Sequence, residues 1–161
     1  MTITDQRLAM QTAIVALLNT VSNVGNVVAY KIRAVDETTF QSIMVYTISG
    51  TKYIRAWEVL WTGVQDVRAG DEGVPLGHVL RRHTFTINGM VGYDEADSDA
   101  TFNELVTSVM DKLTQTYRLS GVSGGHRTLA PTVTMDVVPR GDALVHLAEI
   151  TYTVEELKAV S

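Results

Sequence analysis

The chain has 161 residues and a mass of 17.6 kDa, a length that suits one domain with its own core. Hydrophobic residues make up 45% and charged residues 19%, which excludes disordered and low-complexity classes. The absence of cysteine excludes thiol catalysis, disulfide scaffolds and cysteine-ligated zinc. A net charge of −5 gives no overall attraction for nucleic acid. The sequence shows neither an apolar run long enough to cross a bilayer nor the pattern of a signal peptide, so we expect no membrane or secretory route. We therefore expect a single soluble domain over residues 1–161.

We expect the first helix over residues 4–22. Thr4 and Asp5 are its N-cap candidates, and the helix is expected to end before Gly25. The evidence is one apolar stripe at helical spacing, made of Met10, Ala13, Ile14, Leu17, Leu18 and Val21.

From residue 27 the apolar period changes to two, which predicts sheet. We expect a strand over residues 27–35, a polar turn over 36–39 and a second strand over 40–48, closed by a tight turn at Ser49 and Gly50. A third strand follows, and both of its faces carry apolar groups. One face holds Tyr53, Arg55, Trp57, Val59 and Trp61, and the other holds Ile54, Ala56, Glu58 and Leu60. Such a strand is either covered on both sides or contacts a partner subunit.

Residues 63–77 contain four glycines, a proline and several charges, and predict a long mobile loop. The next strand is expected over residues 79–93, with Asn88 and Gly89 favouring a bulge or bend.

The acidic segment 94–99 precedes the clearest helical stripe of the chain, formed by Phe102, Leu105, Val106, Val109, Leu113 and Tyr117. Thr101 and Glu104 have the spacing of a capping box, Ser98 and Asp99 are alternative caps, and Gly121 is the expected end.

A second mobile loop is expected over residues 121–131, followed by a hairpin that turns at residues 139–142. The return strand alternates between two faces from residue 144 to 154 and ends in a polar tail. The element order α-β-β-β-β-α-β-β predicts an α+β fold, a mostly antiparallel sheet of about four to six strands with two main helices packed on it.

Four patterns bring catalytic or ligand chemistry to mind, and each has a simpler interpretation. His78 and His83 are separated by an odd number of residues in a strand, so their rings point to opposite faces and do not share a metal. The acidic segment 94–99 lacks the spacing of a calcium loop and is typical of a solvated turn before a helix.

The glycine-rich residues 121–127 follow a helix and precede a strand, the reverse of a phosphate loop. Arg140, Gly141 and Asp142 form an integrin-type tripeptide, but their position between two strands favours a hairpin turn. No motif pairs a histidine with a nucleophile. The sequence therefore predicts no catalytic residue, no metal and no cofactor.

Aromatic residues and an arginine share one face of the third strand. This composition is typical of an interface centre, and equally of a core edge where an arginine stem lies on a ring. The candidate subunit or partner interface consists of Tyr53, Arg55, Trp57 and Trp61.

The layout as a whole resembles the tail terminator proteins of long-tailed phages, also called tail completion or minor tail proteins. The resemblance lies in the element order and spans nearly the whole chain. Its segments are the first helix ending at Leu17 and Leu18, strand residues 43–46, 53–57 and 83–87, the helix 101–113 with its tail 117–121, and the closing hairpin through 148–152.

This resemblance implies a protein without catalysis that assembles as a homo-oligomeric ring, typically a hexamer, at the head-proximal end of the tail tube. There the ring stops tube growth and offers the surface that joins the head. The implied partners are further copies of the chain, the tail tube protein and a head-completion or connector protein, with DNA only passing through the lumen without sequence readout. The implied location is the virion, after assembly in the bacterial cytoplasm.

Two alternatives stay open at this point. One is a head–tail connector or neck protein of the same virion, which shares size, acidity and ring assembly. The other is a small enzyme or ligand-binding α+β domain, in which loops near His78, Asp97 and His126 would converge on a pocket.

Overall fold

The computed structural model describes residues 6–33, 37–94, 96–140 and 143–159, and the predicted caps Thr4 and Asp5 lie outside these residues. Within these residues, three helices and seven strands follow one another. They are α1 (Gln6–Leu18), β1 (Asn26–Val28), α2 (Glu37–Ile43), β2 (Val45–Ile48), β3 (Thr51–Val67), β4 (His78–Gly92), α3 (Ser98–Gln115), β5 (His126–Thr128), β6 (Thr132–Arg140) and β7 (Ala143–Ala159). The strands form one sheet in the order β1-β3-β4-β7-β5, with β2 also on β3 and β6 also on β7. All pairings are antiparallel except β1 with β3, which confirms the α+β class with more strands than expected.

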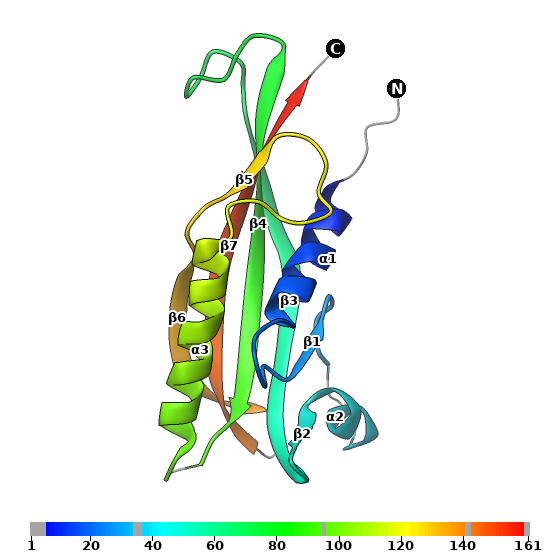
Figure 1. Cartoon of the computed structure of the whole chain (residues 1–161), viewed down its shortest axis with the longest axis vertical. Helices are drawn as coiled ribbons and strands as arrows, with labels where there is room; N and C mark the ends of the chain where they lie inside the picture. Colours follow the sequence, from blue (N-terminus) through cyan, green and yellow to red (C-terminus); the bar gives the residue numbers. More distant parts are fainter. Residues whose placement is uncertain (1–5, 34–36, 95, 141–142, 160–161) are drawn as a thin grey trace.

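The long antiparallel strands β3, β4 and β7 form the centre of the sheet and extend past the helices at one end (Figure 1). Residues 63–67, predicted as loop, belong to β3, and that prediction is wrong. The register shifts between Trp61 and Gly63, and the chain then keeps pairing with β4 as far as Val67 opposite Leu80. Only residues 68–77 connect the two strands. The predicted polar tail is also wrong, because β7 pairs with β4 out to Ala159.

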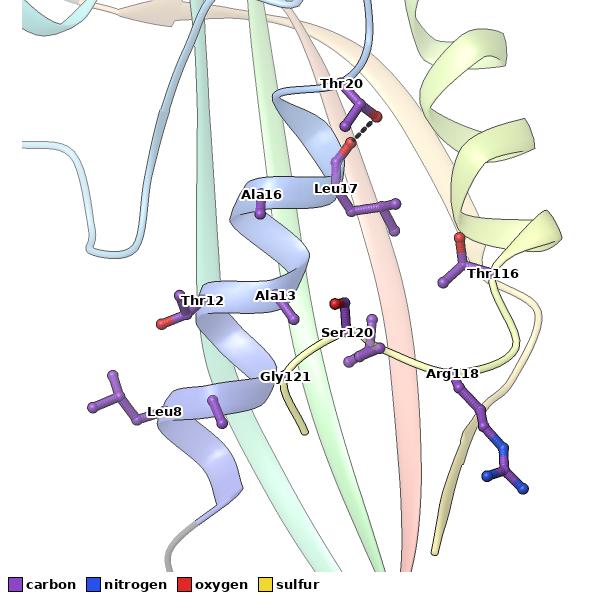
Figure 2. A pocket seen from close by; sticks show the side chains of 12 residues that line it. Leu8, Thr12, Ala13, Ala16, Leu17, Thr20, Thr116, Arg118, Ser120 and Gly121 are labelled. Carbon is purple, nitrogen blue, oxygen red and sulfur yellow. Dashed lines mark hydrogen bonds between the residues drawn. The ribbon is translucent and has the colours of Figure 1, made fainter. Parts of the chain in front are cut away.

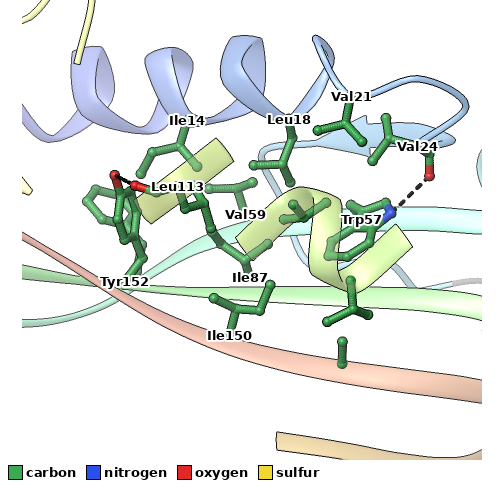
Figure 3. Close-up of a cluster of buried hydrophobic side chains, with 14 of the residues drawn as sticks. Ile14, Leu18, Val21, Val24, Trp57, Val59, Ile87, Leu113, Ile150 and Tyr152 are labelled. Carbon is green, nitrogen blue, oxygen red and sulfur yellow. Dashed lines mark hydrogen bonds between the residues drawn. The ribbon is translucent and has the colours of Figure 1, made fainter. Parts of the chain in front are cut away.

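The main core lies between the sheet and the helices α1 and α3, which cover the same face (Figure 1). The stripe predicted for the first helix buries Met10, Ile14 and Leu18. Figure 3 shows how side chains of α1, α3 and the central strands interdigitate. Fully buried members from the strands are Trp57, Val59, Phe85, Ile87, Ala148, Ile150, Tyr152 and Val154. The alternation read from β4 and β7 is thereby confirmed.

A smaller core covers the opposite face of the sheet near β2. It contains Ile32, Met44, Ala56, Met90 and Val145, with Phe40 and Ile43 packed against it. The third strand is therefore covered on both faces, one of the two possibilities that its sequence indicated. The predicted turn over residues 36–39 and the start of the predicted strand over 40–48 are wrong, because residues 37–43 form α2. Phe40 and Ile43 lie three positions apart on this helix, so both side chains pack against the smaller core.

The first strand is much shorter than predicted, since only Asn26–Val28 pairs with β3. Beyond Val28 the chain is held by Glu58, a fully buried side chain of β3. Its carboxylate accepts hydrogen bonds from the Ile32 amide (2.8 Å) and from Asn88 Nδ2 (2.8 Å), and pairs with Lys31 Nζ (3.0 Å). A buried carboxylate requires such donors, and they draw residues 31–32 away from the sheet edge.

Asn88 and Gly89 pair regularly with β3 and β7, so the predicted bulge is absent at this place. Gly89 instead lies directly beneath the ring of Trp57. A Cβ atom at this position would come within 2.4 Å of the ring. The glycine is needed for close packing and not for a bend.

Helix α3 begins at Ser98, so Thr101 and Glu104 lie inside it and form no capping box. The helix ends at Gln115 rather than near Gly121, and Tyr117, expected in the buried stripe, is exposed. The chain leaves the helix because β5 holds it: the Thr128 amide donates to the Tyr117 carbonyl at 2.9 Å. Strand β5 itself lies within the predicted loop 121–131.

Candidate functional site

The four predicted interface residues have very different environments. Trp57 is fully buried in the main core and donates its indole N–H to the Val24 carbonyl at 2.9 Å, so it offers no surface to a partner. Tyr53 is exposed, and the guanidinium carbon of Arg55 lies 5.0 Å from its ring centre. Arg55 is buried, and Trp61 is half-buried at the edge of β3.

Trp61 is the centre of a small polar hollow of about 410 Å³ at the start of the sheet extension. The Arg7 guanidinium lies 4.8 Å above its ring, and its indole N–H donates to His83 Nδ1 at 3.2 Å. His83 Nε2 lies 2.8 Å from a carboxylate oxygen of Glu156. Because Nδ1 accepts from the indole, Nε2 carries the proton and donates to Glu156. The arrangement orients the tryptophan at the protein surface.

Beyond Trp61, two carboxylates are bound by arginines that lie across the sheet. Asp66 receives two hydrogen bonds from Arg81, which hold the pKa of Asp66 below its ordinary value. Glu155 is buried and contacts both Arg82 and Arg127. Arg82 also pairs with Glu72 of the connecting segment 68–77. These pairs make the extension a fixed part of the sheet.

One edge of β3 is open along residues 60–67, where the central strands extend past the helices. The pairings of β1 and β2 with this edge end at Glu58, and the Val59 carbonyl is taken by Gln11 Nε2 at 2.7 Å. In the part of the chain that the structure describes, residues 60–67 pair only with β4, on the other side. Backbone groups along this edge are therefore available to a further strand.

The opposite edge of the sheet is β6, which pairs only with β7 among the described strands. Met135 and Val137 lie on the helix-covered face but beyond the cover of α3, and are 54% and 42% exposed. Val137 donates its amide to the Asp136 side chain at 2.8 Å, which occupies one donor of the strand. Asp136 and Pro139 are of the kinds that protect an edge strand, but Met135 and Val137 leave exposed apolar side chains on this edge that a partner can cover. Sequence reasoning read β6 as part of a hairpin and did not identify it as this edge.

A hollow of about 840 Å³ lies between α1 and the segment 116–121 (Figure 2). Small or apolar side chains such as Ala9, Ala13 and Leu17 form its walls, and the Thr20 hydroxyl is engaged with the Leu17 carbonyl. Arg118 lies at its rim (Figure 2). The described residues of this hollow bring together no acid, base and nucleophile, so its chemistry fits an apolar contact rather than a reaction.

The residues named for an enzymatic alternative do not converge. Asp97 precedes α3 at one end of the sheet, whereas His78 and His126 lie on strands at the other end (Figure 1). His126 Nε2 accepts the Leu119 amide at 2.9 Å, which makes it a structural residue of the 116–125 segment. Within the described residues, no group of three or more histidine and acidic side chains is placed to hold a metal ion.

Ser98 and His146 lie 2.9 Å apart and at first sight suggest a nucleophile and its base. Asp99 approaches the same nitrogen of His146, at 3.4 Å, whereas an orienting carboxylate belongs on the other nitrogen. The Ser98 hydroxyl also donates to the Asp94 carbonyl and accepts the Asp94 amide. The pair therefore fixes the start of α3 and lacks the geometry of a triad.

Comparisons with known proteins add no assignment. No known protein family matches the chain, and no curated protein shows significant similarity to it. None of the helices in the described residues is long and apolar enough to span a membrane.

Proposed function

We propose that the protein is a non-catalytic structural part of a phage virion, a tail terminator. In this role about six copies form a ring at the head-proximal end of the tail tube, stop its polymerisation and provide the head-joining surface. The proposal rests on the resemblance in element order, which spans nearly the whole chain, and on the α+β fold. The scatter of His78, Asp97 and His126 speaks against the enzymatic alternative.

The observation that carries the proposal is the pair of unlike open edges. The edge of β3 at residues 60–67 contains Trp61, the exposed Val64 and Asp66, whereas β6 exposes Met135 and Val137. Strand addition between two different edges is head-to-tail, and a head-to-tail contact closes into a ring when the rotation per copy suits. Pairing at β6 displaces the Asp136 carboxylate from the Val137 amide.

The proposed partners are further copies of this chain, the tail tube protein and a head-completion or connector protein, with DNA passing through the lumen. The proposed location is the tail of the virion, after assembly in the cytoplasm of the bacterial host. A ring that joins existing tubes needs adaptable contact surfaces rather than a reactive pocket, which agrees with the apolar hollow at α1.

The test is the native mass by light scattering from micromolar to hundreds of micromolar, with electron microscopy of the same samples. We expect a mass near that of six chains and annular particles. Val137→Lys places a charge on the β6 edge and should reduce assembly, whereas Leu76→Lys, at an 86% exposed side chain of the connecting segment, should not. A monomer throughout the range, without rings, would refute ring assembly. Rings that bind isolated heads but not tube ends would instead identify a neck protein.

A further inference from the structure

A polar cleft of about 530 Å³ lies between α3, the turn after α1 and the start of β3. Its walls include Tyr53 and Arg55 from β3, Asn23 from the turn, and Ser108 and Lys112 from α3. It is separate from both open sheet edges, because none of the described residues that line it belongs to 60–67 or to β6. Its chemistry differs from that of the apolar hollow at α1, since charged and hydrogen-bonding groups line it.

Arg55 enters this cleft as a buried cation that has no carboxylate partner among the described residues. The residue is 8% exposed, and its side chain makes one hydrogen bond, from Nη1 to the Asn23 carbonyl at 2.9 Å. Its Nε is buried without any acceptor. No ion pair joins it to another described residue, and its guanidinium lies over the ring of Tyr53. Buried charges in proteins are normally paired, so this guanidinium requires an anion that the described residues do not supply.

A second cation strengthens this requirement. Lys112 is half-buried in the wall of the cleft and forms no ion pair with another described residue. The carboxylate that lines the cleft, Glu104, is exposed and also without an ion pair among the described residues. Two cations against one exposed carboxylate leave the cleft with a positive charge. A carboxylate fits such a site, because arginine binds its two oxygens with two parallel N–H groups.

The same chain carries a complementary anion outside the cleft. The acidic segment 94–99 contains no basic residue, and Asp94 and Asp97 are exposed without an ion pair among the described residues. The Asp99 side chain is 83% exposed, with His146 as its only ion-pair partner among the described residues. Its described residues, Asp94 and 96–99, do not line the cleft of their own chain.

We propose that the cleft of one copy binds the acidic segment 94–99 of a second copy, with its carboxylates against Arg55 and Lys112. The inference deepens the proposed function, because it gives the self-assembly an electrostatic contact in addition to the sheet edges. The contact joins two different surfaces and is compatible with head-to-tail assembly.

The first test titrates the full chain with a peptide of residues 93–100, capped at both ends, and follows the arginine Nε–H and backbone signals by NMR. We expect saturable shifts at Arg55 and along α3, and about tenfold weaker binding in both Lys112→Gln and Arg55→Met. Lys112→Gln keeps the test interpretable if Arg55→Met fails to fold. Arg68→Gln, which removes an exposed charge after β3, is the matched control and should not change the affinity.

A second peptide with asparagine and glutamine in place of its acids should not bind. Absence of binding by the acidic peptide, or binding that ignores both cleft variants, would overturn the proposal. Binding of inorganic phosphate or acetate at Arg55 without binding of the peptide would also overturn it, since the occupant would then be a small anion.

The second test measures assembly of the full chain after charge exchange. Lys112→Glu and Asp97→Lys should each reduce the oligomer at least tenfold, and the double variant should restore it. A ring that is indifferent to all three variants overturns this inference and leaves the proposed function standing. A chain that stays monomeric yet binds the peptide in the cleft supports this inference and refutes the ring.

Discussion

Substitution of Gly89 by alanine tests the packing of the main core. The nearest atoms of the Trp57 ring would lie 2.4, 2.5 and 2.7 Å from the new Cβ. Carbon atoms pack best at about 3.5–4.0 Å, so the ring has to move by about 1 Å or more. Trp57 is fully buried and donates to the Val24 carbonyl, so it has no free space to enter without losing that bond.

The expected loss of stability follows from three contributions. Overpacking of a core costs about 1–3 kcal/mol. Loss of the indole hydrogen bond costs about 1 kcal/mol, and the reduced freedom of the unfolded chain returns about 0.5 kcal/mol. We expect Gly89→Ala to lower the free energy of unfolding by about 1.5–3.5 kcal/mol, which shifts the urea midpoint by about 1 M.

The assay is urea unfolding followed by far-UV circular dichroism and by tryptophan fluorescence, which also reports the displaced ring. Gly63→Ala is the matched control, because its Cβ would meet Thr84 at 3.7 Å, an ordinary contact. We expect this control to stay within about 0.5 kcal/mol of the parent chain. A Gly89→Ala protein as stable as Gly63→Ala would refute the packing deduced for Trp57.

Three further changes have defined outcomes. Glu58→Gln places an amide among the donors of Ile32 and Asn88 and should cost about 2 kcal/mol in urea unfolding, with faster proteolysis after residue 28. Asp66→Asn should lower the free energy of unfolding by less than about 1 kcal/mol. This stabilisation is present above the ordinary aspartate pKa and is lost as pH falls through the lowered pKa of Asp66. Equal acid unfolding of both proteins would contradict this. Burial raises the pKa of Tyr152. The neutral phenol therefore stabilises the fold at pH values below the ordinary tyrosine pKa, and this stabilisation is lost as pH rises through the raised pKa of Tyr152. An ultraviolet titration should show a late tyrosine phase that Tyr152→Phe abolishes.

Much of the fold could be predicted because its signals are local. The stripes of α1 and α3 and the alternation of β4 and β7 place apolar side chains on one face by geometry alone, and the structure buries those faces. Strand β3 could be recognised as covered on both faces for the same reason. Among the four candidate interface residues, composition could not separate the buried Trp57 from the exposed Tyr53, because an interface centre and a core use the same residue types. Their role as an interface stays a prediction.

The sequence by itself determined the class of the fold, the two main helices and the central strands, since each depends on periodic burial within one segment. Only the tertiary structure decided where elements end: Glu58 draws Ile32 off the sheet, and His126 holds Leu119 so that α3 stops early. It also decided that Gly89 accommodates the Trp57 ring and that Arg55 is buried with no counter-ion among the described residues. These features join residues 7 to 32 positions apart along the chain, and no local period records such contacts.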